Sequence, residues 1–222
     1  MTHTVITIAQ QKGGAGKTTV AAHLAVALSQ RGKRVAVIDI DPQGSLAHWH
    51  KLREERFGEG YTGMSFATIS GWRVSSEINR LKRDHDFIII DSPPHTEADA
   101  KTAIREADLV LLPVQPSPTD LWATQATLKL AKDERKLVKV ILNRVSPHSK
   151  LAQMALDTLG SEDVMEHTLG NRVLFASALI EGRTATETNP SHQASLEVKA
   201  LANEVLGLVQ TDEETQNTAV PA

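Results

Sequence analysis

Near its amino terminus the chain reads Lys12-Gly13-Gly14-Ala15-Gly16-Lys17-Thr18-Thr19, directly after the apolar run Val5-Ile6-Thr7-Ile8-Ala9. This order predicts a buried strand that leads through a glycine-rich loop into a helix. Glycines let backbone N–H groups turn inward around a polyphosphate, Lys17 supplies a positive charge, and the Thr18 hydroxyl is suited to ligate the Mg²⁺ of a bound nucleotide. The stretch therefore predicts a phosphate-binding loop.

The loop departs from the usual pattern G-x-x-x-x-G-K-S/T at its first position. Gln11 stands where the leading glycine is expected, and a second lysine, Lys12, follows it. Because Lys12 and Lys17 share one tight loop, their ammonium groups need not serve the same phosphate of the same subunit. The string resembles the deviant Walker A family, which includes ParA partition ATPases, MinD and the nitrogenase iron protein. The resemblance implies that Lys12 reaches across a nucleotide-sandwich homodimer to the partner's phosphates.

Length and composition limit the other classes of protein. The chain has 222 residues, of which 41% are hydrophobic, so it can bury one substantial core. It has no cysteine, which excludes disulfides and iron–sulfur clusters and sets the chain apart from the nitrogenase iron protein. The first strand begins within a few residues, and no apolar run approaches membrane-spanning length. We therefore expect a cytoplasmic protein without a signal peptide or an added amino-terminal DNA-binding domain.

The domain organisation follows from the same patterns. A single deviant Walker A ATPase domain is expected over residues 1–209. Residues 210–222 are polar and carry Asp212, Glu213 and Glu214 without a basic residue. This composition predicts a disordered carboxy-terminal tail.

Apolar runs and helical spacing alternate along the chain. Strands are predicted at 34–39, 65–68, 87–91, 109–114, 137–142 and 164–168. Helices are predicted from the phosphate-binding loop to Gly32 and at 46–57, 74–81, 118–132, 150–159, 173–180 and 191–208. The alternation predicts the α/β fold of P-loop NTPases, a mostly parallel twisted sheet with helices on both faces.

Polar residues stand where three of the predicted strands end. These residues are Asp39, Asp91 and Asn143. Ligands of open parallel sheets bind at the carboxyl ends of the strands, so all three are candidates for the site. Asp39 and Asp41 flank Ile40 in extended chain, which places their side chains on the same side.

The resemblance gives these acids separate roles. The string Asp39-Ile40-Asp41-Pro42-Gln43 resembles the switch I motif of ParA-type ATPases, which implies that Asp41 orients the attacking water and that Asp39 lies in the hydration shell of Mg²⁺. Asp91 follows four apolar residues and fits a Walker B acid that polarises a water bound to Mg²⁺. Ser92-Pro93-Pro94 resembles the switch II motif of the family, a loop that reports the γ-phosphate.

The expected cofactors are ATP and Mg²⁺. Asn143 can donate and accept hydrogen bonds along the adenine edge, and the resemblance supports that role. The expected catalytic residues are Lys12, Lys17 and Asp41, and the expected metal-site residues are Thr18, Asp39 and Asp91. The expected nucleotide-binding residues are Gly13, Gly14, Ala15, Gly16, Lys17, Thr18, Thr19 and Asn143.

Two further strings narrow the resemblance. Ser45-Leu46-Ala47-His48-Trp49, and the run from Pro113 to Asp120, resemble the short ParF-type subgroup of ParA ATPases, which lacks an amino-terminal DNA-binding domain. The subgroup implies a switch in which ATP assembles a dimer on nonspecific DNA of the nucleoid. A ParB-like or centromere-binding partner then stimulates slow ATP hydrolysis and release. The cargo is left open as a plasmid, a chromosome locus or a protein cluster.

Net charge and charge distribution indicate DNA binding less strongly than the motifs indicate nucleotide binding. The net charge of −3 and the pI near 6.3 do not indicate a nucleic-acid binder, although residues 129–150 hold seven basic residues against two acids. We expect a salt-sensitive DNA face to form only in the dimer. Its expected residues are Arg144, Lys150, Arg172 and Arg183.

Two other functions share the same loop. A MinD-like membrane switch should end in a basic amphipathic helix, whereas residues 210–222 are polar and acidic, so no membrane partner is expected. A metabolic P-loop enzyme such as a dethiobiotin synthetase-like ligase also has this fold. Lys12 together with Asp41 favours the dimerising switch.

Overall fold

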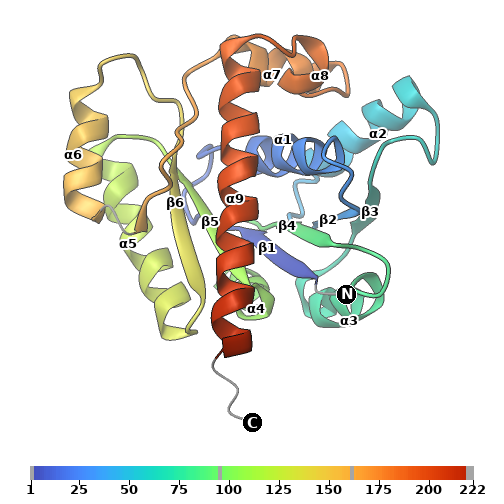
Figure 1. The fold of residues 1–222 in the computed structure, drawn as a ribbon, viewed down its shortest axis with the longest axis horizontal. Helices are drawn as coiled ribbons and strands as arrows, with labels where there is room; N and C mark the ends of the chain where they lie inside the picture. The colour runs from blue at the N-terminus through green and yellow to red at the C-terminus, as the bar shows by residue number, and fades with distance from the viewer. Residues whose placement is uncertain (1–2, 95–96, 161–162, 219–222) are drawn as a thin grey trace.

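A single sheet forms the centre of the molecule in the computed structural model, which describes residues 3–94, 97–160 and 163–218. Neighbouring strands are all parallel, in the order β3-β2-β4-β1-β5-β6 (Figure 1). The strands are β1 (Thr4–Ile8), β2 (Val35–Asp39), β3 (Ser65–Thr68), β4 (Phe87–Asp91), β5 (Leu109–Val114) and β6 (Leu137–Leu142). The predicted α/β fold is confirmed.

Helices cover both faces of the sheet. One face is covered by α1 (Lys17–Ser29), α2 (Ser45–Phe57), α7 (Val173–Ile180), α8 (Ala185–Thr188) and α9 (Gln193–Thr218). The other is covered by α3 (Val74–Leu81), α4 (Glu97–Glu106), α5 (Pro118–Asp133) and α6 (Lys150–Leu159), with the short 3-10 helix η1 (Gly71–Arg73) before α3. In Figure 1 the long helix α9 crosses in front of the sheet beside α1.

The apolar runs are explained by burial on both sides. In β2, Val35 and Val37 belong to the core under α1 and α9, whereas Ala36 and Ile38 belong to the core under α3 and α4. Successive side chains of a strand point to opposite faces, so a sheet covered on both faces needs apolar residues at every position. The strands therefore read as continuous apolar runs rather than as alternating ones.

The register of the sheet sets the position of the acids. Ile8 of β1 pairs with Asp91 of β4, and Asp91 pairs with Asp39 of β2. The phosphate-binding loop leaves β1 directly after Ile8. The loop and both carboxylates therefore meet at one edge of the sheet.

The predicted end of the last helix was wrong. The sequence pattern placed it at Leu208, and residues 210–222 were expected to be disordered, but α9 continues to Thr218. No proline or glycine lies between Leu208 and Thr218, and the first proline is Pro221, so no residue forces the helix to stop earlier. Residues 219–222 lie outside the described part of the chain. No described helix is both long enough and apolar enough to span a membrane.

The strand predicted at 164–168 was also wrong. This segment makes one isolated bridge, between Val164 and Val140, and Gly170 just after it makes another with Val145. The backbone N–H groups of Glu166 and His167 donate instead to the carboxylate of Glu204 on α9, at 2.6 and 3.0 Å. The Glu204 side chain thus accepts hydrogen bonds that would go to a neighbouring strand if this segment were part of the sheet.

Two helices had not been predicted. Helix α4 lacks a strong apolar stripe, yet it buries Ala103 and Ile104 against the sheet. Helix α8 is one turn long and is held by a capping box between Thr184 and Glu187, a pattern that the sequence does contain.

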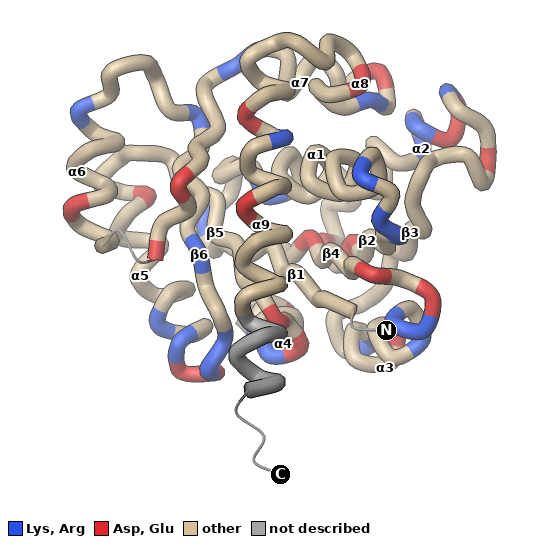
Figure 2. Tube along the Cα trace, viewed as in Figure 1, with Lys and Arg blue, Asp and Glu red and all other residues tan. Residues whose placement is uncertain are grey.

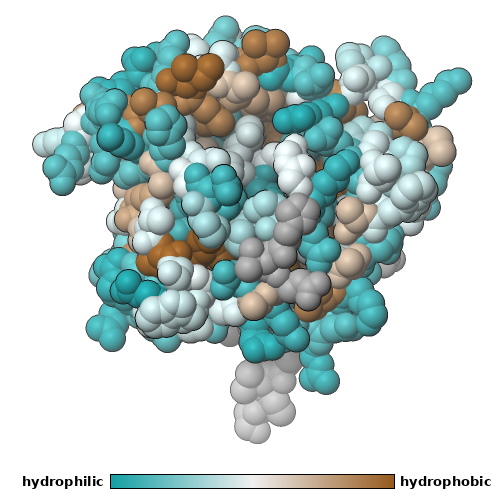
Figure 3. All heavy atoms as spheres, turned by 180° about the vertical axis from the view of Figure 1, so that it is seen from behind, coloured by the Kyte–Doolittle hydropathy of each residue, from teal (hydrophilic) through white to brown (hydrophobic). Residues whose placement is uncertain are grey.

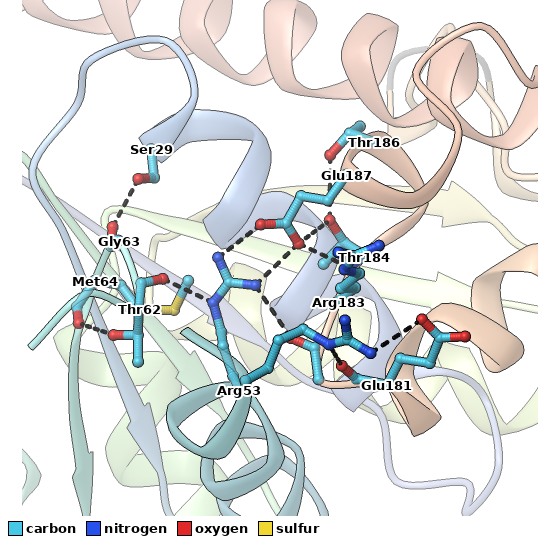
Figure 4. A network of polar contacts seen from close by, with 12 residues as sticks. Ser29, Arg53, Thr62, Gly63, Met64, Glu181, Arg183, Thr184, Thr186 and Glu187 are labelled. Carbon is cyan, nitrogen blue, oxygen red and sulfur yellow. Dashed lines mark hydrogen bonds and ion pairs between the residues drawn. The ribbon is translucent and has the colours of Figure 1, made fainter. Parts of the chain in front are cut away.

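Arg53 of α2 ties that helix to α8 and to the segment between α7 and α8 (Figure 4). Its guanidinium is buried and donates to both carboxylate oxygens of Glu187, at 2.7 and 2.9 Å, and to the carbonyl oxygens of Thr62 and Gly182. Gly182 has φ +66°, and a Cβ there would lie 2.6 Å from the backbone of α2, so glycine is required for this close approach. The network fixes α8 and the turn that follows α7 relative to α2.

We expect Glu187→Gln to lower the free energy of unfolding by about 3 kcal/mol, because it leaves the buried guanidinium without its counter-charge. Urea denaturation would measure the change. Asp133→Asn is the matched control, since it removes an exposed pair with Lys129 and should cost about 0.5 kcal/mol or less. Equal effects of the two substitutions would contradict the structural role of Arg53.

Candidate functional site

The phosphate-binding loop joins β1 to α1 and borders a cleft of about 550 Å³. Gly16, the residue before the first turn of α1, has φ +103°, and a Cβ there would lie 2.3 Å from Nδ2 of Asn143. Only glycine fits this position. Of the expected nucleotide-binding residues, Ala15 is buried, and the loop lines the cleft with Gly13, Gly14, Gly16, Lys17, Thr18 and Thr19.

Lys17 is held at the base of the cleft. Its side chain is buried, and Nζ donates to the carbonyl oxygen of Gln10 at 3.1 Å. Burial lowers the pKa of Lys17, and the nearby carboxylates of Asp91 and Asp41 oppose that shift. The ammonium group therefore stands at the amino end of α1 among acids, in a place suited to a polyphosphate.

Asp91 and Thr18 form the pair on which a metal site would be built. Thr18 Oγ1 donates to Asp91 Oδ2 at 2.7 Å, while the buried Oδ1 has no hydrogen-bond partner among the described residues. Burial raises the pKa of Asp91 to about 7, and the charge of Asp39 adds to this shift. The free oxygen and the hydroxyl fit Mg²⁺, because hard cations prefer oxygen ligands.

Asp39 organises the segment that follows β2. Its Oδ1 accepts from the backbone N–H of Asp41 and its Oδ2 from that of Ala47, both at 2.9 Å. Burial raises the pKa of Asp39. Asp41 accepts from the backbone N–H of Gln43 and lines the cleft. The switch I segment and the start of α2 are therefore pinned to the edge of the sheet.

Among the described residues, no three His, Cys, Asp or Glu side chains gather in a way that would hold a metal ion. Thr18, Asp39 and Asp91 supply one hydroxyl and two carboxylates at the same sheet edge. Mg²⁺ is usually bound by one or two carboxylates together with phosphates and water. The arrangement thus fits Mg²⁺ that arrives with a nucleotide.

Lys12 lies outside the lining of its own cleft. Its Nζ is 2.5 Å from Asp120 Oδ2 and 3.4 Å from Thr119 Oγ1, at the first turn of α5. Asp120 is nearly buried, and it also accepts from the hydroxyl of Ser117, which caps the helix. No sequence pattern predicts this ion pair, because Lys12 and Asp120 are 108 residues apart in the chain.

Asn143 braces the loop in this structure. Its Nδ2 donates to the carbonyl oxygen of Ala15 at 2.8 Å, and its Oδ1 accepts from the backbone N–H of Arg144. Gln115 makes a similar contact, with Nε2 3.1 Å from the carbonyl oxygen of Gly14. The expected adenine contact of Asn143 stays a prediction, and Gln115 had been missed because its role depends on a neighbouring strand.

The far wall of the cleft had no signal in the sequence. It is formed by α2 and α7 with His48, Trp49, Leu52, Leu179 and Ile180. Trp49 Nε1 donates to the carbonyl oxygen of Arg183, which links α2 to the segment that follows α7. A mostly apolar wall opposite a polar phosphate-binding loop is the usual division between the base and phosphate parts of a nucleotide site.

The four expected DNA-contacting residues do not form one group in the monomer. Arg144 is exposed at the cleft, and Lys150 is exposed at the start of α6. The guanidinium of Arg172 is paired with Glu197 at 2.8 Å, and Arg183 lies between α7 and α8. In the coloured part of Figure 2, basic residues are interspersed with acids over many elements.

The fold and the loop agree with the comparison to known families. The chain matches the CobQ/CobB/MinD/ParA nucleotide binding domain over residues 6–218, and it belongs to that family. The resemblance stated from the sequence is thereby confirmed, and ATP with Mg²⁺ is the ligand pair of such P-loop ATPases.

Several relatives extend over almost the whole chain. Maintenance of carboxysome distribution protein A of Halothiobacillus neapolitanus is 29% identical over 90% of this chain and 95% of its own. The chromosome-partitioning ATPase Soj of Thermus thermophilus is 27% identical, with 92% and 96% covered. The MinD structure from Pyrococcus horikoshii, complexed with Mg-ADP, has a TM-score of 0.78 at 24% identity, with 94% and 98% covered.

We expect Asp91→Asn to stabilise the nucleotide-free protein at pH 8, on the order of 2 kcal/mol, because a neutral amide removes a buried charge. The folded-state pKa is raised, so the folded wild type keeps a proton that the unfolded chain loses above about pH 4. Wild-type stability should therefore fall as the pH rises toward 7.

Thermal unfolding of both proteins at pH 5 and pH 8 would test this expectation. The advantage of Asp91→Asn should shrink at pH 5, where wild-type Asp91 is largely protonated. An advantage of the same size at both pH values would show that the pKa of Asp91 is not raised.

Proposed function

We propose that the protein is an ATP-dependent dimerising switch that hydrolyses ATP and positions a cargo on nonspecific DNA with a ParB-like or centromere-binding partner. The observation that carries this proposal is the position of Lys12, which points away from its own cleft and pairs with Asp120. A lysine of the phosphate-binding loop that does not serve its own cleft is available to a second subunit.

The residues divide the work of hydrolysis. Lys17 and the amino end of α1 bind the phosphates, and Thr18, Asp39 and Asp91 would hold a hydrated Mg²⁺ that would supply positive charge beside the phosphates. Asp41 lines the cleft next to the loop and orients the attacking water. Lys12 leaves Asp120 and adds a positive charge to the partner's triphosphate, where charge develops during phosphoryl transfer.

The relatives support a positioning role and leave the cargo open. They include a carboxysome distribution protein, the chromosome-partitioning ATPase Soj and the protein ParA of Rhizobium radiobacter. MinD of Bacillus subtilis is also similar, at 23% identity. Dimerisation and partner proteins are common in this family. We infer a slow basal ATPase that a partner stimulates, associated with the nucleoid of the cytoplasm.

Three substitutions test the switch. Lys17→Ala should lose nucleotide binding and dimerisation together, because the buried cation is removed. Asp41→Ala should bind ATP normally, hydrolyse it about 10²-fold more slowly and accumulate as a dimer. Lys12→Ala should bind ATP but should fail to dimerise or, if it dimerises, should fail to hydrolyse ATP.

Light scattering with ATP and Mg²⁺ would measure assembly, calorimetry would measure binding, and phosphate release would measure hydrolysis. Asp84→Ala is the control, since Asp84 is an exposed acid outside the cleft. A monomeric Asp41→Ala protein at saturating ATP, or equal loss of ATP binding in Lys12→Ala and Lys17→Ala, would contradict the assignment.

DNA binding is proposed for a face formed by Arg144, Lys150, Arg172 and Arg183 in the dimer. Fluorescence anisotropy with a random-sequence duplex, ATP and Mg²⁺ should show affinity that falls steeply with salt. Lys150→Ala should reduce the slope of log K against log salt by about one. Lys101→Ala, on α4 and paired with Glu134, lies outside the proposed face and should leave the slope unchanged. Absence of retention at low salt would end this part of the proposal.

A further inference from the structure

Helix α7 buries only one of its sides. Phe175 and Ala178 are buried, and the Phe175 ring packs edge-on against His23 of α1, with ring centroids 5.1 Å apart. The outward residues follow the i, i+3, i+4, i+7 spacing of a single helix face. We call this face the α7 stripe, and it consists of Val173, Ala176, Ser177 and Ile180.

The α7 stripe is unusually apolar for an exposed surface. Val173 is 85% exposed and Ile180 is 76% exposed, and residues 173–180 include no charged side chain. Figure 3 shows apolar surface gathered along the upper edge of the molecule, where α7 lies in Figure 1. A helix that is apolar on all sides is normally buried on all sides, so this face needs a cover.

The stripe is continuous with the nucleotide cleft. Ile180 lines the cleft together with the phosphate-binding loop, whereas Val173, two turns earlier on the same face, lies outside the cleft lining. A partner protein that closes the mouth of the cleft therefore also contacts Ile180.

The charges that flank the stripe are already neutralised within the subunit. Arg172, just before α7, is paired with Glu197, and Glu181, just after it, is paired with Arg56 at 3.3 Å. The stripe itself carries no charge, so the DNA contacts proposed for Arg172 and Arg183 would lie beside the stripe and not on it. An apolar partner surface matches it.

We propose that the α7 stripe packs against a second copy of this chain when nucleotide is bound. The proposal rests on the nucleotide-sandwich dimer of the proposed function, because a second subunit that closes over the cleft would cover Ile180. In a two-fold dimer each patch is used by both subunits, so the apolar stripe must meet a surface of the same chain. The small residues Ala176 and Ser177, between larger Val173 and Ile180, permit close approach of a facing backbone.

The first test measures burial of the stripe directly. The chain has no cysteine, so Ser177→Cys introduces a unique thiol at an exposed position. Its maleimide labelling should be fast without nucleotide and should slow strongly with a non-hydrolysable ATP analogue and Mg²⁺. Gln125→Cys, exposed on α5, is the control and should label equally fast in both states.

The second test uses assembly. Val173→Asp should weaken dimerisation about tenfold or more, since a carboxylate would be buried in an apolar contact. It should leave ATP affinity unchanged, because Val173 is outside the cleft lining. Trp72→Asp, at an 80% exposed apolar position on η1, is the matched control and should dimerise as the wild type does.

The outcomes separate this inference from the proposed function. If the wild type dimerises but Ser177→Cys stays fully reactive, or Val173→Asp assembles normally, the proposed contact of the α7 stripe is contradicted. The proposed ATP-dependent switch is not affected by that result. Loss of ATP affinity in Val173→Asp would also overturn it, since the helix would then serve the nucleotide. A wild type that never dimerises would overturn both.

Discussion

The parallel register of β1, β4 and β2 is the constraint on which the rest of the structure depends. Pairing Ile8 with Asp91, and Asp91 with Asp39, places two carboxylates beside the glycine-rich loop. The loop then turns into α1, so its amino-terminal N–H groups and Lys17 face the same point. A shift of one residue in any of these strands would send the carboxylates into the apolar core on the other face.

This arrangement is costly for the empty protein. Burial raises the pKa values of Asp39 and Asp91 and lowers that of Lys17. The charged form of each group is therefore less stable in the folded protein than it would be in water. Such strain in titratable groups is common at functional sites, where a ligand relieves it. A polyphosphate with its metal supplies both signs of charge that these residues lack.

The elements around the cleft are linked by contacts that cross the chain. Arg53 joins α2 to the segment after α7, and Lys12 joins the phosphate-binding loop to α5. The proposed change on dimerisation moves Lys12 from Asp120 to a partner and covers the α7 stripe. Ile180 of the stripe lines the cleft that the partner's Lys12 would enter in the proposed dimer, so nucleotide binding and assembly would be coupled.

The sequence by itself determined the loop, the strand ends with Asp39 and Asp91, the parallel fold and the family. The spacing of the glycines and the continuous apolar runs of strands buried on both faces can be recognised directly in the sequence. Only tertiary structure decided the partner of Lys12, the bracing role of Asn143 and the apolar wall from α2 and α7. Lys12 and Asp120 are far apart in sequence, and no local pattern records which side chains a crossover brings together. The missed helix α4 and the wrongly predicted strand at 164–168 have the same cause, since packing and the Glu204 carboxylate, rather than local preference, set their conformation.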